Sequence, residues 1–176
     1  DRDDRPDIYV ANDYTDPDRL WLNQGPDESG VVRFRDATAE FLPYTTWFSM
    51  GSDVADVNGD GRLDFMVADM SATTHFKAKT TMGEMNGWRR WVLENAWPRQ
   101  AMRNMLFVDS GAGRFREAAY IAGVASSDWT WAVKLADFDL DGRNDLFLTN
   151  GTARVFSTPG RSHRSRSRAS IRETVS

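Results

Sequence analysis

Two stretches of the chain place oxygen-bearing side chains on alternate residues around a glycine. One reads DVNGDGRLD (56–64) and the other reads DFDLDGRND (137–145). Oxygen atoms on alternate residues of a tight loop can converge on one point, and glycine at the sixth position supplies the positive φ that closes the loop. Calcium accepts about six to eight such hard oxygens in flexible geometry, whereas magnesium requires a tighter octahedron. The pattern therefore predicts two calcium sites.

A shortened copy of the same pattern opens the chain, so we name three turns in chain order: the first (1–7), the second (56–64) and the third (137–145). The predicted ligands are side-chain oxygens at positions 1, 3, 5 and 9 and the backbone carbonyl at position 7. They are Asp56, Asn58, Asp60, Arg62 and Asp64 in the second turn, Asp137, Asp139, Asp141, Arg143 and Asp145 in the third, and Asp1, Asp3 and Asp7 in the first.

Two other interpretations of these turns have to be weighed. Asp, Asn and Gly form turns without any metal, but several like charges in one loop repel each other unless a cation neutralises them. The second turn also resembles the start of an EF-hand loop, which needs a carboxylate at position 12 and a helix after it. Position 12 is Val67 or Leu148, and the residues that follow have a strand pattern. The EF-hand interpretation is therefore rejected.

The sequence segments on either side of these turns, which must position them, recur in a fixed order. Each turn is followed by an apolar run, and the phrases RLWLNQG…VRFRDAT (19–38) and NMLFVDSG…GRFREAA (104–119) form a second repeat. The pattern predicts units of about 60 residues, each with four short strands. The run Phe65 to Ala68 is apolar on both faces, as in a strand covered by two neighbouring sheets. In 32–38, Val32 and Phe34 are predicted to face inward and Arg33 and Arg35 outward, as in an outer, half-solvated strand.

Four-stranded antiparallel sheets repeated in this way predict an all-β fold of β-propeller blades. About three partial blades fit within residues 1–151, so we expect either a fragment of a longer protein or a partial propeller with exposed edges that could pair with another chain. Residues 71–103 form an insertion, in which WRRWVLENAW (88–97) predicts a short helix ended by Pro98. Its residues Trp88, Trp91 and Trp97 either bind a ligand or pack the insertion onto the body.

The phrases together resemble FG-GAP/VCBS repeats of the ASPIC/UnbV, cartilage-acidic-protein type, over roughly residues 1–151. The resemblance implies an integrin-α-like β-propeller with calcium in its blade loops, usually secreted, periplasmic or attached to the cell surface. It also implies adhesion or ligand binding, to a protein or a glycan, without catalysis. The calcium ligands implied by the resemblance are Asp56, Asn58, Asp60, Asp64, Asp137, Asp139, Asp141 and Asp145.

Charge is divided unevenly along the chain. The formal net charge is −4, but residues 1–150 carry −9 and residues 151–176 carry +5. An acidic body argues against nucleic-acid binding, because phosphates are bound by clustered Lys and Arg. The apolar runs are too short to span a membrane, and the absence of cysteine excludes disulfides and thiolate metal sites. The Arg/Ser-rich residues 152–176 are expected to be a disordered tail.

A glycan-active enzyme, a polysaccharide lyase or hydrolase, is the alternative to a binding module. It would need two carboxylates facing a sugar cleft. Asp69, Glu84, Glu94 and Asp128 are candidates among the acids left outside the turns, and nothing about their spacing singles out a pair. The sequence therefore favours a non-catalytic calcium-binding module.

Overall fold

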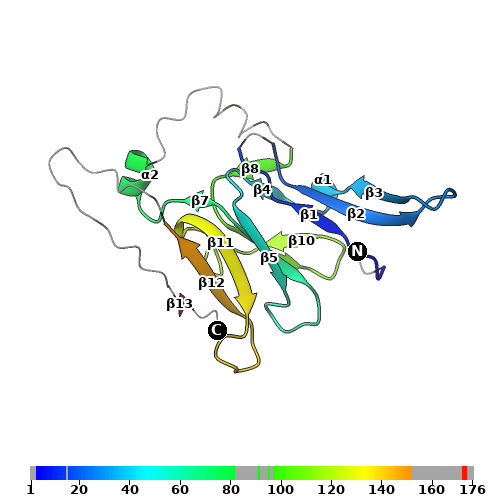
Figure 1. Cartoon of the computed structure of the whole chain (residues 1–176). Coiled ribbons are helices and arrows are strands. Elements are labelled where there is room, and N and C mark those ends of the chain that lie inside the picture. The colour runs from blue at the N-terminus through cyan, green and yellow to red at the C-terminus, as the bar shows by residue number, and fades with distance from the viewer. Residues whose placement is uncertain are drawn as a thin grey trace.

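The chain folds mainly into antiparallel sheets in the computed structural model, which describes residues 3–14, 16–81, 91, 95, 97–151 and 172–173 (Figure 1). The strands are β1 (Ile8–Val10), β2 (Arg19–Pro26), β3 (Val32–Asp36), β4 (Tyr44–Thr46), β5 (Gly51–Ala55), β6 (Asp64–Ala68), β7 (Met70–Ser71), β8 (Arg99–Ala101), β9 (Met105–Asp109), β10 (Phe115–Glu117), β11 (Asp128–Ala136), β12 (Asp145–Asn150) and β13 (Arg172–Glu173). The described helices, α1 (Thr38–Phe41) and α2 (His75–Thr81), are short. The predicted all-β class is confirmed.

One sheet contains the complete predicted unit. Its order is β10-β9-β6-β5, and each pair is antiparallel. In chain order, β5 leads into the second turn, β6 leaves it, and β9 and β10 are the strands of NMLFVDSG and GRFREAA. The predicted four-stranded blade is therefore confirmed here, although the insertion separates β6 from β9.

The other two large sheets have parts of the same arrangement. The first has the order β1-β2-β3, in which β1 follows the first turn, and the third has the order β13-β12-β11-β7. β11 and β12 flank the third turn as β5 and β6 flank the second. The three sheets do not close into a ring within the described residues, so the structure shows part of a repeat array and not a whole propeller.

Strand β6 lies between two hydrophobic clusters. Phe65 and Val67 pack with Phe107 of β9 and with Leu22 of β2 in the first sheet. Met66 and Ala68 belong to the second cluster, which includes Leu135 of β11. All five β6 residues are buried. The prediction of a strand covered on both faces is confirmed, and this strand carries Asp64 at its first residue.

Strand β3 is an outer strand, as predicted, but its apolar residues do not pack inward. All five of its residues are exposed, including Val32 and Phe34, which is 40% exposed. Among the described strands, β3 is at the edge of the first sheet and pairs only with β2. Alternation placed these apolar residues on one face correctly, but no described element covers that face, so the predicted inward packing is wrong.

The insertion and the tail are described only in part. Within the insertion, α2 lies before the predicted helix, and β8 pairs in parallel with β4. Of residues 88–97 only Trp91, Asn95 and Trp97 are described; Trp91 and Asn95 are helical, and Asn95 Nδ2 donates to the Trp91 carbonyl at 2.7 Å. In the tail, β13 pairs with β12, and the rest of 152–176 lies outside the described residues. No described helix has the length and hydropathy of a membrane span.

Candidate metal-binding turns

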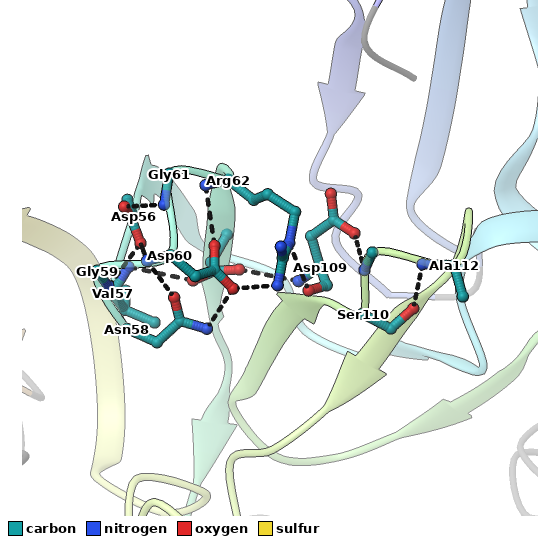
Figure 2. Close-up of polar contacts among 12 residues, drawn as sticks. Asp56, Val57, Asn58, Gly59, Asp60, Gly61, Arg62, Asp109, Ser110 and Ala112 are labelled. Atoms are coloured by element: carbon teal, nitrogen blue, oxygen red, sulfur yellow. Dashed lines mark hydrogen bonds and ion pairs between the residues drawn. The ribbon is translucent and has the colours of Figure 1, made fainter.

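The second turn connects β5 to β6 and is wound around one carboxylate. Asp56 Oδ1 accepts hydrogen bonds from the Gly59 N–H at 2.8 Å and the Asp60 N–H at 3.1 Å, and its Oδ2 accepts from the Gly61 N–H at 2.8 Å (Figure 2). Gly59 and Gly61 have φ of +73° and +79°, which glycine adopts without strain. The Gly61 N–H, with those of Asp60 and Gly59, lowers the pKa of the Asp56 carboxyl.

The third turn, between β11 and β12, repeats this geometry. Asp137 Oδ1 accepts from the Asp141 N–H at 3.1 Å, and its Oδ2 accepts from the Gly142 N–H at 2.9 Å. The residues at positions 4 and 6 again have positive φ, +64° at Leu140 and +88° at Gly142. Two sequences with the same spacing therefore fold the same loop, as the alternating oxygens predicted.

The aspartate at the ninth position of the second and third turns accepts a hydrogen bond from the second residue of its own loop. Asp64 Oδ2 accepts from the Val57 N–H at 3.1 Å and Asp145 Oδ2 from the Phe138 N–H at 3.0 Å. Asp64 Oδ1 also accepts from the Asp109 N–H of β9 at 2.8 Å. Burial raises the pKa of the Asp64 carboxyl, and the negative charges of the nearby carboxylates raise it further. A cation at this turn would remove that repulsion.

The third turn brings three carboxylates together. Oxygen atoms of Asp137, Asp139 and Asp145 all lie within 4.8 Å of one another. Asp141 instead accepts the Arg143 N–H at 2.9 Å through Oδ1. Hard, negatively charged oxygens at this separation fit a divalent cation that accepts carboxylate ligands. Three of the five residues predicted for this turn are thus brought together in the structure.

The second turn contains its own cation. The Arg62 guanidinium forms an ion pair with the Asp60 carboxylate, and Arg62 Nε donates to the Asp109 carbonyl at 3.3 Å (Figure 2). Asn58 Nδ2 donates to the same Asp60 carboxylate at 2.9 Å. The side chain of Arg62 therefore lies between the turn and the β9–β10 hairpin. Sequence analysis assigned only the backbone carbonyl of Arg62 to the site and did not anticipate this ion pair.

The first turn repeats this pairing between Asp3 and Arg5. Asp1 lies outside the described residues, and Arg5 Nε donates to Asp3 Oδ2 at 2.7 Å. The Arg5 side chain lies against Gly25 in the β2–β3 hairpin, where a Cβ would come within 2.9 Å of Arg5 Nη1. Asp4, which replaces the glycine at position 6, has φ of +61°. The backbone thus keeps the left-handed conformation of the other turns, although Asp is less suited to it.

The ninth residue of the first turn also has its counterpart contact. Asp7 Oδ1 accepts the Asn23 N–H of β2 at 2.9 Å, as Asp64 accepts the Asp109 N–H of β9. Asp7 therefore occupies the position in its sheet that Asp64 occupies in the second.

The second and third turns lie beside each other. Asn144 Nδ2, at position 8 of the third turn, donates to the Asp56 carbonyl at 2.7 Å. The strands that lead into the two turns are also joined, because Asp53 Oδ2 on β5 accepts the Leu135 N–H of β11 at 2.7 Å. An ion that orders one of these turns would therefore act on the neighbouring sheet.

Two buried acids outside the turns hold the loops at the other end of the sheets. Asp18 is fully buried and accepts from the Asn12 N–H at 2.8 Å, the Tyr9 hydroxyl at 2.6 Å and the Ser49 hydroxyl at 2.6 Å. Asp69 is also fully buried, and its Oδ2 accepts from the Trp47 N–H at 2.8 Å. Burial raises the pKa of the Asp69 carboxyl to about 7, although the Trp47 N–H lowers it in part.

Sequence reasoning did not assign these structural roles, yet the repeat contains a signal for them. Asp18 precedes RLWLN as Asn104 precedes MLFVD, and Asn12 and Asp69 stand five residues after the ninth positions Asp7 and Asp64. The contacts correspond: Asn104 Oδ1 accepts the Asp69 N–H at 2.8 Å, as Asp18 accepts the Asn12 N–H. Aligning the repeats would have identified both positions.

The acids that an enzyme could use are accounted for only in part. Asp128 accepts from the Thr73 N–H at 3.0 Å and forms an ion pair with Lys77, and Asp69 is buried as described above. Glu84 and Glu94 lie outside the described residues. Asp69 and Asp128 therefore have structural partners.

The tryptophans of the insertion are exposed where they are described. Trp91 is 61% exposed and Trp97 is 74% exposed, and Trp88 lies outside the described residues. Neither Trp91 nor Trp97 is therefore buried against the body of the protein.

Comparison with known families agrees with this geometry. Residues 1–67 match the family model of the FG-GAP-like repeat. The match covers the first turn, the first sheet and the second turn, and ends within β6. FG-GAP repeats are typical of extracellular β-propeller modules for binding and adhesion, are generally non-catalytic, and often bind calcium. No curated protein matches the chain.

Proposed function

We propose that this chain is a calcium-stabilised, non-catalytic binding module of the ASPIC/UnbV type that acts outside the cytoplasm on a protein or carbohydrate ligand. The observation that carries the proposal is the convergence of Asp137, Asp139 and Asp145 in a turn whose fold the second turn repeats. The FG-GAP repeat in residues 1–67 supports it independently.

Calcium fits these turns better than magnesium. The ligands would be the side-chain oxygens at positions 1, 3, 5 and 9 and the carbonyl of Arg62 or Arg143, which gives a loose cage of protein oxygens. Magnesium demands near-ideal octahedral geometry and keeps several of its waters. Because an empty cluster of carboxylates is repulsive, the binding free energy of the ion adds to the free energy of unfolding.

Thermal unfolding with and without the ion tests the proposal. At a calcium concentration of about 100 Kd, each occupied site adds roughly 2.7 kcal/mol to the free energy of unfolding. For a chain of this length that corresponds to a rise in Tm of about 5–10 °C. Chelation should reverse the rise, and the same concentration of magnesium should produce little of it.

A pair of variants locates the effect. Asp139→Asn removes a charged oxygen from the third turn and should reduce the calcium-dependent rise in Tm. Asp27→Asn is the matched control, because Asp27 lies in another exposed turn, where it binds the Ser29 N–H at 2.9 Å and Arg33 at 2.8 Å. Its Tm should still rise normally with calcium. A Tm that does not depend on calcium in the unmodified chain contradicts the proposal.

A further inference from the structure

A cavity of about 500 Å³ opens between α1, β8 and the start of β10. We call it the aromatic groove and define it by Phe41, Tyr44, Trp97, Arg99, Arg114 and Phe115. Phe41, Arg114 and Phe115 also line a second cavity of about 560 Å³ that extends toward the first and second turns. The groove is therefore one part of a longer depression between the first and second sheets.

The groove is cationic, although the body of the chain is acidic. The side chains of Arg99 and Arg114 are both exposed, and neither guanidinium has a hydrogen bond or ion pair in the part of the chain that the structure describes. The acid that lines the groove, Glu40, is paired with Arg35 at 2.7 Å. Two arginines are thus available for a ligand in a region where residues 1–150 carry a net charge of −9. A planar guanidinium binds a carboxylate through two parallel hydrogen bonds.

The same groove holds an exposed aromatic side chain on an anchored backbone. Trp97 is 74% exposed, but the next residues are fixed, because Pro98 and Gln100 are buried and Gln100 Nε2 donates to the Tyr14 carbonyl at 3.3 Å. Strand β8 also pairs with β4, with Arg99 opposite Tyr44. A large apolar ring held in water by a fixed backbone is a preorganised surface for a flat ligand face.

We propose that the aromatic groove binds an acidic saccharide. A uronate residue combines a flat C–H face, which stacks on the Trp97 indole, with a carboxylate on the rim of the ring, which pairs with Arg114 or Arg99. One sugar residue therefore engages both kinds of group that the groove presents. The inference rests on the proposed function as a binding module and names its ligand class.

Binding of a hyaluronan hexasaccharide to the full chain in millimolar calcium tests this assignment by calorimetry. The same hexasaccharide with its carboxyl groups reduced to alcohols is the matched probe, and it should bind at least tenfold more weakly. Arg114→Gln and Arg99→Gln should each lower the affinity for the acidic hexasaccharide about tenfold. Trp97→Ala should lower it as well. Arg116→Gln is the control, because Arg116 is exposed on β10 and does not line the groove, and its affinity should not change.

Several outcomes would overturn the assignment. Equal binding of the reduced hexasaccharide, no binding, or an effect of Arg116→Gln equal to that of Arg114→Gln would each contradict it. Tighter binding of poly-L-glutamate than of the hexasaccharide would make an acidic protein the ligand instead. The calcium-dependent rise in Tm, measured on the same samples, separates the two proposals. If that rise persists without saccharide binding, only the groove assignment fails; if the rise is absent, the proposed function fails.

Discussion

Replacing Arg62 with glutamine should increase the affinity of the second turn for calcium. The Arg62 guanidinium is paired with the Asp60 carboxylate, so it occupies an oxygen that the ion needs. Arg62→Gln removes this internal cation and leaves the backbone carbonyl of residue 62, the group predicted to bind the ion, in place. The side-chain change thus separates the two roles of this position.

The expected change in calcium affinity is estimated from the solvent exposure of the Arg62–Asp60 ion pair. The side chains of Arg62 and Asp60 are 34% and 24% exposed, so their ion pair is partly solvated and contributes about 0.5–1 kcal/mol. Without calcium, the variant should be less stable by that amount. Because calcium would have to displace the pair in the unmodified chain, the affinity of the second turn should rise by up to about fivefold in the variant. At saturating calcium the two proteins should then be almost equally stable.

Calcium titrations by calorimetry test this prediction. They are done in an Asp139→Asn background, which weakens the third turn, so that the measured calcium affinity is that of the second turn. Arg143→Gln, in a chain with an intact third turn, is the control, because Arg143 has no side-chain ion pair in the described part of the chain. It should leave calcium affinity unchanged. An affinity that stays the same or falls in Arg62→Gln would refute the competition between guanidinium and ion.

Two further predictions concern buried groups. Burial raises the pKa of the Asp69 carboxyl to about 7. Between about pH 5 and 7 the folded chain therefore keeps a proton on Asp69 that the unfolded chain has released. The free energy of unfolding should then fall with rising pH by up to about 1.4 kcal/mol per pH unit. Urea titrations in saturating calcium should show this slope in the unmodified chain and not in Asp69→Asn; equal slopes would contradict the assignment. Phe107 is fully buried and its ring centroid lies 4.7 Å from that of Phe65, so Phe107→Ala should cost about 3–5 kcal/mol in urea unfolding. Phe34→Ala, on exposed β3, should cost under about 1 kcal/mol, and comparable losses would show that the core is placed wrongly.

The features that could be predicted from the sequence are those set by the spacing of residues within one short segment. The alternating oxygens and the glycine of the second turn are set within nine residues, and the loop forms as that spacing requires. The run Phe65 to Ala68 is apolar at every residue, which already implied cover on both faces. In both cases the information lies within one short segment of chain.

What the sequence could not show depends on contacts between distant segments. The alternation of β3 shows which residues share a face but not whether another sheet covers it. The ion pair of Arg62 depends on the β9–β10 hairpin, because Arg62 also donates to Asp109, 47 residues along the chain. Asp18 is buried because Thr46 and Ser49 fold back over it. An isolated aspartate in the sequence gives no information about that packing.

Anomalous diffraction from crystals of the chain grown in calcium would test the central claim most directly. The account predicts one anomalous peak within the oxygens of Asp56, Asn58, Asp60 and Asp64, and another within those of Asp137, Asp139 and Asp145. In the second turn the Arg62 side chain should then lie away from Asp60. Water in both turns, with Arg62 still paired to Asp60, would contradict the claim that these turns are calcium sites.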